Sequence, residues 1–380
     1  MNIISFLLLI FKTKFLQIIK VSFAIMKGEI SYYPSSVKNF EHKFKKKLNI
    51  NHSLMFSNAT SAMEAALFAG GIKNGSIVGT TAFVIPSSYS SVKSLNARLE
   101  FYDVDLKTLN FNCDQFLNQT VEISALIVTH FYGNPCDMEV IMDFAKKRNI
   151  FVVEDCSHAH GATINGKAVG TFGNVGIFSL QGAKAIAAGE GGIAVSHSSS
   201  IMTKMAAYGH QESYKNFKIS NDEDHPLPSF GFGKKMRAHP LGAILAYEDF
   251  KNLDRKNEIF TSWFNEISDI SNKSKIFSLP KKLSSAEIGG FCQGIPLIFE
   301  KKEYALVAEG RLRKSKINFF KRDYRDAIKD FTHHQHRDDV LDKLPDTVDA
   351  FDRVIFIPFY QFVLYWRWIK LKKVLKSKIL

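Results

Sequence analysis

Residues 152–195 read VVEDCSHAHGATINGKAVGTFGNVGIFSLQGAKAIAAGEGGIAV, and the apolar runs of this stretch decide the fold. Three runs in it and at its edges predict short buried strands, namely Ile150–Glu154, Val175–Ser179 and Gly192–Ser196. Each run contains valine and isoleucine and is followed by polar or glycine-rich sequence, which is typical of strands in a sheet covered on both faces. The stretch therefore places acidic residues, a lysine and several glycines just beyond strand ends.

Strand and helix signals also alternate upstream of this stretch. Ile77–Thr81, Ala97–Tyr102 and Ala125–Thr129 predict further strands, and the apolar spacing of Asp137–Arg148 predicts a helix that follows them. This alternation predicts an α/β fold with a mostly parallel central sheet and helices on both faces. In such sheets ligands bind beyond the carboxyl ends of the strands. The loops after the strands are therefore the candidate functional segments.

We expect three parts in the chain. Residues 1–26 form an apolar and basic N-terminal extension, residues 27–254 form a large domain, and residues 255–380 form a smaller C-terminal α+β domain. The polar, turn-rich residues 211–234 predict a surface loop, and Pro240–Asp254 predicts one long helix. Other expected elements are a basic helix over 38–48 and strands over Gly294–Phe299 and Val354–Pro358.

The composition narrows the class of protein. The 380 residues are 46% apolar and 23% charged, which excludes a disordered chain, a collagen-like chain and a multi-span membrane protein. The net charge of +13 favours anionic partners such as phosphorylated metabolites, although a lysine-rich soluble enzyme has the same balance. No nucleic-acid-binding motif is present, so we expect no such partner. Four cysteines without a C-x-x-C pair predict reduced thiols and a cytoplasmic location.

Both ends of the chain combine apolar and basic residues. The apolar run Phe6–Phe11 is too short to span a bilayer, which takes about 20 residues. Either this end forms an amphipathic helix on a partner or membrane surface, or the native chain starts at Met26. Residues 365–380 predict a basic amphipathic helix, which either closes the second domain with its apolar side or binds an anionic membrane.

Three features place chemistry at strand ends and at a helix start. Asp155 follows a buried strand, where its carboxylate can face a ligand, and Lys184 follows another strand in a loop of small residues. Residues 58–61, Asn-Ala-Thr-Ser, open an apolar helix whose free N–H groups and dipole favour a phosphate. Each feature alone is common, because strand-end acids are often turn residues, such helix starts are often only caps, and loop lysines are usually solvated.

Together, the three features are the parts that pyridoxal phosphate requires. A lysine amine forms a Schiff base with the aldehyde of this cofactor. A carboxylate keeps the pyridine nitrogen protonated, so that the ring withdraws electrons. A helix start holds the phosphate.

The sequence strongly resembles the DegT/DnrJ/StrS family of pyridoxal-phosphate-dependent sugar aminotransferases. The similarity covers about residues 28–260 well and the remainder loosely. The resemblance implies fold type I, with a large domain around a mostly parallel sheet, a smaller C-terminal domain, and a homodimer with active sites at its interface. The stretches that carry it are NATSAMEAAL (58–67), FYDVD (101–105), THFYGNPCDM (129–138), residues 152–195 and KKMRAHPLGAILA (234–246).

The resemblance also implies roles for individual residues. Lys184 and Asp155 would be catalytic, with Lys184 forming the Schiff base and Asp155 pairing with the pyridine nitrogen. No metal is implied. The other cofactor-binding positions are Thr60 and Ser61 at the phosphate, Phe83 stacked on the ring, His158 near the phenolic oxygen where glutamine is usual, Ser179 beside the cofactor, and Lys235 facing the phosphate across the dimer interface.

This sequence departs from the family pattern at several positions. Ala183 stands where a Ser or Thr is usual, so one phosphate hydroxyl is missing, and Pro86 and Met236 replace the usual Thr and Tyr. The second domain has FTHHQHRDD over 331–339 and no H-Y-P motif. These departures leave the cofactor core intact and concern the preference for the acceptor.

The implied reaction moves an amino group from an amino acid, with glutamate as the expected donor, to a keto-sugar carried on a nucleotide. The product would serve a surface polysaccharide, lipopolysaccharide or related glycoconjugate. Two alternatives stay open. The chain could be a catalytically degenerate relative with a regulatory or scaffold role. It could also be a pyridoxal-phosphate-dependent sugar dehydratase, although those members of the family typically have His in place of the lysine.

Overall fold

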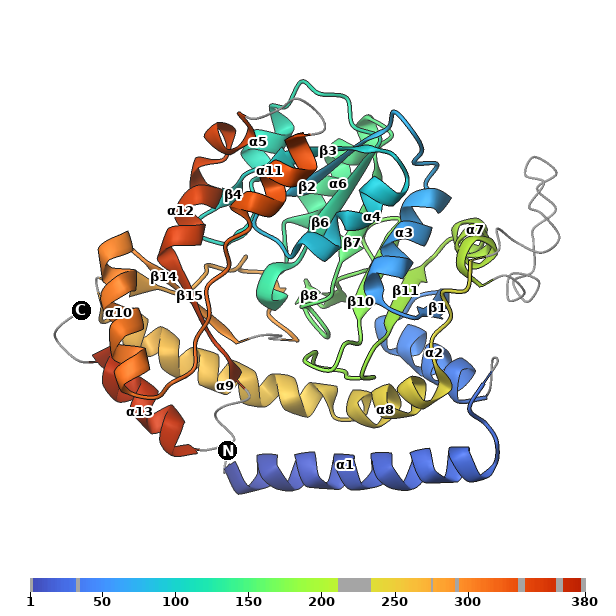
Figure 1. Ribbon diagram of the computed structural model, residues 1–380, viewed down its shortest axis with the longest axis horizontal. Coiled ribbons are helices and arrows are strands. Elements are labelled where there is room, and N and C mark those ends of the chain that lie inside the picture. The colour runs from blue at the N-terminus through green and yellow to red at the C-terminus, as the bar shows by residue number, and fades with distance from the viewer. Residues whose placement is uncertain are drawn as a thin grey trace.

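A seven-stranded sheet crosses the centre of the larger domain (Figure 1). Its strands lie in the order β1-β11-β10-β7-β6-β2-β3, and all are parallel except β11, which is antiparallel to both of its neighbours. The computed structural model describes residues 3–31, 35–210, 234–274, 276–290, 294–333, 339–359 and 365–376. The strands are β1 (His52–Phe56), β2 (Ile77–Thr81), β3 (Arg98–Tyr102), β6 (Ala125–Thr129), β7 (Phe151–Asp155), β10 (Val175–Ser179) and β11 (Gly192–Ser196).

This sheet confirms the predicted α/β fold. All six strands predicted for the large domain are present, and β2, β6, β10 and β11 have the predicted bounds. The sequence pattern missed β1, because HSLMF follows a helix closely and has only three apolar residues in a row. The strand forms through its antiparallel pairing with β11, which lies about 140 residues further along the chain.

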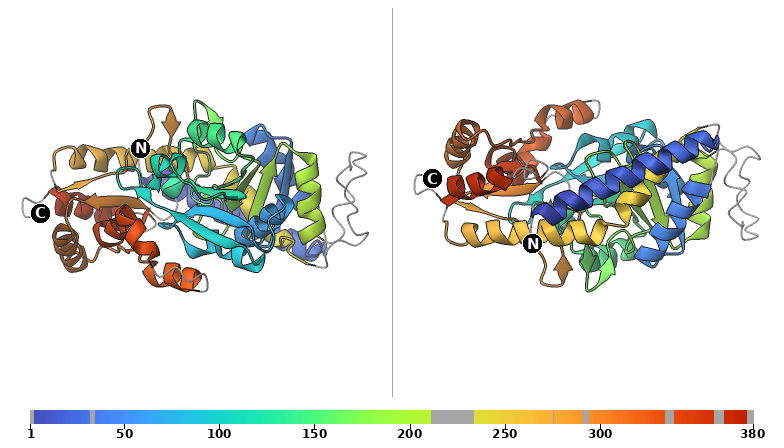
Figure 2. Two further views of the ribbon diagram at one scale, coloured as in Figure 1. Left: turned by 90° about the horizontal axis from the view of Figure 1, so that it is seen from above. Right: turned by 90° about the horizontal axis from the view of Figure 1, so that it is seen from below.

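The helices cover both faces of the sheet, as Figure 2 shows. They are α1 (Ile3–Met26), α2 (Ser35–Leu48), α3 (Ala59–Ala69), α4 (Ser90–Ser94), α5 (Cys113–Leu117), α6 (Met138–Lys147), α7 (Ser199–Gly209), α8 (Pro240–Phe250), α9 (Leu253–Ser271), α10 (Lys302–Lys314), α11 (Arg325–His333), α12 (Pro345–Arg353) and α13 (Tyr365–Lys376). Alternate side chains of each strand enter two different cores. Ile127 of β6 packs in one core with α3 and α7, whereas Leu126 and Val128 pack in the other with α2, α6 and α8.

A three-stranded antiparallel sheet, β12-β14-β15, forms the second domain. It packs with α9, α10 and α13 around a third core. Trp368, Leu371 and Leu375 of α13 are buried in that core, so α13 closes the domain as one of the two hypotheses for it predicted. The remaining strands are β4 (Val104–Asp105), β5 (Asn110–Phe111), β8 (Thr163–Ile164), β9 (Lys167–Ala168), β12 (Phe277–Ser278), β13 (Ala286–Glu287), β14 (Ile295–Phe299) and β15 (Val354–Ile357).

The prediction of one helix over Pro240–Asp254 was wrong, because two helices share this stretch. α8 ends at Phe250 and α9 begins at Leu253 and continues to Ser271. Between them the Asn252 side chain turns back and donates to the carbonyl of Glu248 (3.1 Å) and to Thr13 Oγ1 (3.0 Å). Residues 211–233 and 334–338 and Cys292 lie outside the described residues, so the loop expected over 211–234 and most of the 331–339 stretch are not described.

The N-terminal residues form a continuous helix. α1 lies along α8 on the outside of the molecule (Figures 1 and 2). None of the helices within the described ranges is long and apolar enough to cross a membrane.

Asp103 joins the two domains through a buried carboxylate. It follows β3 and accepts hydrogen bonds from the N–H groups of Asp346 (2.9 Å) and Thr347 (2.7 Å) and from the Thr347 hydroxyl (2.6 Å). These donors belong to the first turn of α12, where the positive end of the helix dipole favours an anion. The contact fixes α12 against the large domain.

Replacing Asp103 by alanine should therefore destabilise the folded protein by about 3 kcal/mol, since the three donors of α12 and the Val104 N–H lose a charged acceptor. The urea midpoint of unfolding measures this loss. Asp105→Ala is the matched control, because the Asp105 carboxylate accepts only from the Lys107 N–H among the described residues, and its loss should cost about 1 kcal/mol. Equal shifts for the two variants would show that Asp103 does not join the domains.

Candidate active site

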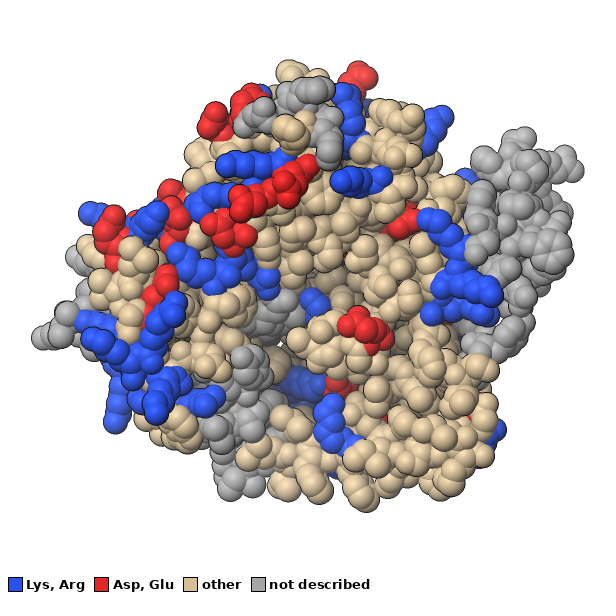
Figure 3. Space-filling view, viewed as in Figure 1, with Lys and Arg blue, Asp and Glu red and all other residues tan. Residues whose placement is uncertain are grey.

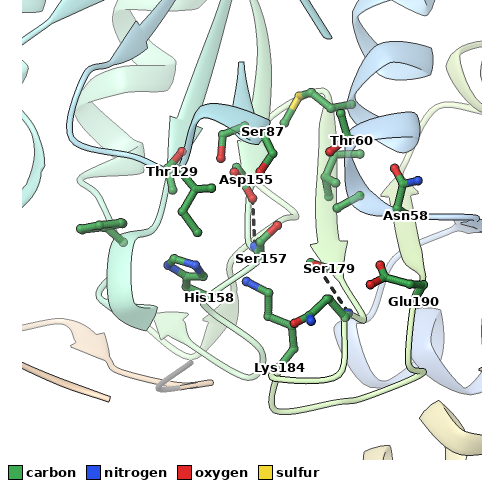
Figure 4. A pocket seen from close by; sticks show the side chains of 17 residues that line it. Asn58, Thr60, Ser87, Thr129, Asp155, Ser157, His158, Ser179, Lys184 and Glu190 are labelled. Atoms are coloured by element: carbon green, nitrogen blue, oxygen red, sulfur yellow. Dashed lines mark hydrogen bonds between the residues drawn. The ribbon is translucent and has the colours of Figure 1, made fainter. Parts of the chain in front are cut away.

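A cavity of about 270 Å³ lies at the carboxyl ends of β2, β6, β7 and β10. This is the edge at which ligands bind in open α/β sheets. Its wall contains Asp155 at the end of β7, Ser179 at the end of β10, Lys184 in the following loop, and Thr60 at the start of α3. Figure 4 shows these side chains around one space, although they come from three separate parts of the chain.

Asp155 is buried at the end of a central strand. One of its carboxylate oxygens accepts the N–H of Ser157 (3.0 Å), which turns the chain away from the strand. The other oxygen has no hydrogen-bond partner among the described residues. The carboxylate is therefore able to accept a hydrogen bond from a ligand in the cavity.

The preceding residue, Glu154, points to the opposite face of the sheet and fixes the end of β7. Its buried carboxylate accepts the N–H groups of Gly170 (2.7 Å), Phe172 (2.7 Å) and Gly173 (2.6 Å). These bonds hold the loop before β10 against β7. The same loop is needed to start β10 in register with β7.

His130, Glu154 and Cys156 lie close enough together to suggest a metal site, with ligand atoms within 4.8 Å of one another. The hydrogen bonds argue against that function. His130 Nδ1 accepts the Cys136 N–H (3.1 Å), so Nε2 carries the proton and donates to Glu154 (3.0 Å). Burial raises the pKa of the Cys156 thiol well above its usual value, so the metal-binding thiolate is disfavoured. The cluster is a structural hydrogen-bond network.

Lys184 lies in the loop that connects β10 to β11. The loop is closed by hydrogen bonds from the Lys184 N–H to the Gln181 carbonyl (2.8 Å) and from the Gly182 N–H to the Gly189 carbonyl (2.8 Å). Its amine extends into the cavity, between His158 on one side and the start of α3 on the other (Figure 4). The surface of this part of the molecule is hollowed near the centre of the face seen in Figure 3.

The start of α3 offers N–H groups to the cavity. The Asn58 side chain accepts the N–H of Ser61 (2.7 Å), and the Asn58 carbonyl accepts the N–H of Ala62 (3.2 Å). The N–H groups of Ala59 and Thr60 have no acceptor within the helix, because the first turn of a helix leaves its donors unpaired. These two donors and the Thr60 hydroxyl form the part of the wall that fits an anion.

Close packing against β11 positions this helix start. A Cβ atom on Gly192 would lie 2.5 Å from the Asn58 carbonyl carbon and 2.6 Å from the Ala59 nitrogen. Only glycine allows this approach, because backbone atoms cannot move aside as a flexible side chain can. Gly192 therefore determines how close α3 lies to the loop of Lys184.

His158 forms the opposite wall of the cavity. Burial, and then the positive charges of Lys184 and Arg322, lower the pKa of His158 well below its usual value, so its ring is neutral. Its Nδ1 is buried and has no partner among the described residues. Such an atom is unfavourable unless a ligand supplies a partner. His158 therefore fits a hydrogen bond to a polar atom of a bound molecule.

Three of the predicted site residues lie away from the cavity wall. Ser61 uses its N–H in the cap, and Lys235 is exposed and does not line this cavity. Phe83 is buried between Phe131 and Phe351, with ring centroids 5.3 and 5.4 Å away. The structure thus places Phe83 in the core.

The sequence interpretation missed several polar residues of the wall. Thr129 is the last residue of β6, and the rule that ligands lie beyond strand ends was sufficient to find it. Ser87 lies in η1 (Pro86–Ser88), the turn after β2. Ser88, Ser157, Gln181 and Glu190 complete the set. Their spacing in sequence carries no signal, because each depends on the path of a loop.

Arg322 brings a cation from the second domain close to this site. Its guanidinium donates to Tyr132 Oη (3.2 Å) and also to Tyr324 Oη. The Tyr132 ring stacks on Phe356 with centroids 4.5 Å apart, and it lies 5.7 Å from the His158 ring. The contact between the domains is therefore continuous with the wall of the cavity.

A mostly parallel sheet of this order, a smaller C-terminal domain, and a lysine and an aspartate at one ligand cavity define the fold of the pyridoxal-phosphate-dependent transferases of fold type I. The chain belongs to the DegT/DnrJ/EryC1/StrS aminotransferase family, whose sequence profile matches residues 17–363. The match therefore includes most of the second domain, where the sequence resembles the family only loosely.

Known proteins support this membership. The chain is 36% identical over 173 residues to GDP-perosamine synthase from Escherichia coli O157:H7, covering 45% of this chain and 48% of that protein. It is 29% identical over 250 residues to UDP-4-amino-4,6-dideoxy-N-acetyl-beta-L-altrosamine transaminase from Campylobacter jejuni, covering 63% and 64% of the two chains. The chain spans about half the length of the perosamine synthases that it matches. An aminotransferase from Psychrobacter cryohalolentis has the same fold, with a TM-score of 0.82 and 21% identity over 94% of this chain and 96% of that chain.

Replacing Gly192 by alanine should displace the start of α3 and cost about 1–3 kcal/mol, as overpacking usually does. Thermal unfolding measures the loss. Gly182→Ala is the control in the same loop, because a Cβ there would meet only the Gly189 carbonyl oxygen at 3.6 Å. A Gly192→Ala variant that melts like the Gly182→Ala variant would contradict the close approach of α3 to β11.

Burial makes the stability depend on pH most strongly through three histidines. It lowers the pKa of His158 well below its usual value and the pKa values of His160 and His210 to about 3. The unfolded chain binds protons at these positions below a pKa of about 6.5, whereas the folded chain does not, so the free energy of unfolding falls as the pH drops below that value. Between about pH 7.5 and 5.5 each histidine should cost about 1.4 kcal/mol.

Urea unfolding at a series of pH values tests this expectation. His210→Phe removes one of the three groups at a position outside the cavity wall, and should reduce the histidine contribution by about a third, or about 1.4 kcal/mol over the same range. An unchanged pH dependence in this variant would mean that His210 titrates normally in the folded protein.

Proposed function

We propose that this protein is a pyridoxal-phosphate-dependent aminotransferase that moves an amino group from an amino acid, with glutamate as the expected donor, to a keto-sugar carried on a nucleotide. The observation that carries the proposal is the cavity itself. It has the Lys184 amine, the open carboxylate oxygen of Asp155 and the unpaired N–H groups at the start of α3 in its wall. A pyridine ring with an aldehyde and a phosphate requires these three partners.

The residues present fit this cofactor. The unpaired Nδ1 of His158 matches a polar oxygen on the ring, and the Ala59 and Thr60 N–H groups match its phosphate. When bound, pyridoxal phosphate supplies an aldehyde that bonds to amines and a ring that withdraws electrons. Asp155 would hold a proton on the ring nitrogen, and Ser179 would contact the phosphate side of the cavity.

The chain's own residues have separate tasks in this reaction. Lys184 would move a proton between the α-carbon of the donor and the aldehyde carbon of the cofactor, because its amine is the basic side chain that extends into the cavity. His158 stays neutral and orients the ring by hydrogen bonding. Glu154 acts indirectly, because it fixes the strand end that carries Asp155.

The acceptor class rests on the relatives and on charge. Two similar proteins bear the names of enzymes for GDP-linked and UDP-linked amino sugars. The net charge of +13 suits a diphosphate-bearing substrate. We place the product in the synthesis of a surface polysaccharide or other glycoconjugate.

We also propose a homodimer. Lys235 is exposed and lies away from the cavity of its own chain, as expected of a residue that completes the site of a second copy. Arg237 is held beside β1 by its backbone bridge with Phe56, which positions the segment around Lys235 at the surface. Phe83 would contact the cofactor only if the second copy or the cofactor changed its packing in the core.

The presence of Lys184 counts against a dehydratase, since the dehydratases of the family typically have His at this position. No single residue of the sequence counts against the scaffold alternative in the same way. Incubation with glutamate distinguishes a scaffold protein from an aminotransferase, because a scaffold does not convert the bound aldehyde to the amine. Mass spectrometry of a panel of nucleotide-linked keto-sugars, incubated with protein and glutamate, then identifies the acceptor.

The Lys184→Ala variant should lose the visible absorption band that borohydride removes from the wild-type protein, together with all amine transfer, because the covalent bond to the cofactor needs this amine. Lys167→Ala is the control, since Lys167 is exposed and contacts the Phe172 ring outside the cavity. A colourless wild-type protein that takes up no cofactor would end this proposal.

A further inference from the structure

The N-terminal helix α1 turns its polar side toward the rest of the protein. Thr13, Gln17, Lys20 and Ala24 recur at helical spacing and face α8. Gln17 Nε2 donates to the Leu245 carbonyl (2.8 Å), and the buried Thr13 hydroxyl accepts from Asn252 (3.0 Å). The helix is therefore fixed in one orientation by buried hydrogen bonds.

An ion pair strengthens this attachment. Lys20 donates to Glu248, a carboxylate that is almost fully buried and also bonds to Lys251. Burial raises the pKa of Glu248, but the hydrogen bonds from the two lysines outweigh this effect and hold the pKa below its usual value. Glu248 therefore stays charged and paired under α1.

The apolar side of α1 faces solvent as a result. Among the described residues, eight of the fifteen exposed large apolar side chains belong to this one helix. Phe11 is 72% exposed and Ile18 is 66% exposed, although such residues are normally buried. A helix of 24 residues is about 36 Å long, so this face exceeds the apolar patches that monomers usually expose. The eight are Leu7, Leu8, Phe11, Phe15, Ile18, Phe23, Ile25 and Met26.

The charged side chains of α1 itself are all positive. No acidic residue occurs before Glu29, whereas Lys12, Lys14, Lys20 and Lys27 lie on or next to α1. Packing two copies of this face together would bring these lysines near one another without acids on the helix to pair with them. An anionic lipid surface offers both an apolar layer and negative headgroups.

The helix α13 adds a second basic and aromatic element. Trp366 is half exposed, and the Arg367 and Lys370 side chains lie over its ring. α13 has no acidic residue, and Lys and Arg side chains gather over α10 and α13 at the lower left of Figure 3. Ile10 of α1 packs against the core that contains Trp368, and the two helices are seen together from below in Figure 2.

We propose that α1 and α13 together bind the protein to the surface of an anionic lipid bilayer. α1 lies flat, with Phe11, Phe15 and Ile18 in the boundary between headgroups and acyl chains, while its polar side stays on α8. Lys12, Lys14 and Lys27 beside it and Lys370 and Lys373 of α13 contact the headgroups, each contributing a factor of about five in binding. Trp366 lies at the interface, where aromatic side chains are favoured.

Flotation of the full-length protein with vesicles tests this proposal. Vesicles of phosphatidylcholine with phosphatidylglycerol should bind the protein, and added salt should weaken the binding. Vesicles of phosphatidylcholine alone should bind at least about 25-fold less, because the contributions of all the lysines are then lost. The double variant Phe11→Ser/Phe15→Ser should lose about tenfold or more, because two large apolar side chains no longer enter the boundary.

A matched control comes from another exposed apolar pair. Leu306→Ser/Val307→Ser changes two exposed residues of α10 and should leave vesicle binding within twofold. Lys370→Gln/Lys373→Gln should weaken binding to anionic vesicles about 25-fold and leave binding to neutral vesicles unchanged. Circular dichroism checks that every variant is folded.

Three results would overturn the proposal. One is equal loss of binding in the α1 pair and the α10 pair. Another is a change of oligomeric state in the Phe11→Ser/Phe15→Ser variant without vesicles, since the face would then be covered by protein. The third is native protein that begins at Met26, because it would lack the helix.

Discussion

The parallel pairing of β7 with β10 brings Asp155 opposite Ile177, two residues before β10 ends at Ser179. Only a short closed turn separates Ser179 from Lys184, so this register determines where the amine lies relative to the carboxylate. Two acids stand side by side at the end of β7, and they point to opposite faces. A slip of one residue would place Glu154 in the cavity wall and turn Asp155 to the opposite face of the sheet. The three N–H groups that donate to Glu154 oppose that slip. The buried Glu154 carboxylate has these hydrogen-bond partners only in the observed register.

The anion-binding side of the cavity depends on a second close contact, between α3 and β11. These segments are more than 120 residues apart in sequence, and no side chain separates them at Gly192. The antiparallel pairing of β1 and β11 causes this contact. Phe56 lies opposite Gly192, and the chain turns into α3 directly after Phe56. The helix start, the lysine loop and the strand-end acid therefore form one rigid frame. A ligand that bridges them needs little reorganisation of the protein.

Much of this frame could be predicted from the sequence, because buried parallel strands are continuous apolar runs and their ends are marked by polar residues. Asp155 and Lys184 were found in this way and Thr60 from the start of a helix, and the cavity wall contains all three. Strand β1 could not be found, since it depends on a distant partner. The break between α8 and α9 depends on the Asn252 side chain, which no periodicity records. The packing of Phe83 against Phe131 and Phe351 could not be predicted either, because a place in the chain does not determine which rings an aromatic side chain contacts.

The orientation of α1 also depends on polar side chains of a distant segment. Apolar periodicity predicts a helix over this stretch, and the usual expectation is that the apolar side faces the protein. Here α8 presents a buried carboxylate, Glu248, to α1, and the loop that follows α8 presents the amide of Asn252. An apolar side packed on these groups would leave them without partners, which costs more than the exposure of a phenylalanine that can be covered elsewhere. The polar stripe of α1 satisfies them, and the apolar stripe is left for a surface outside the chain.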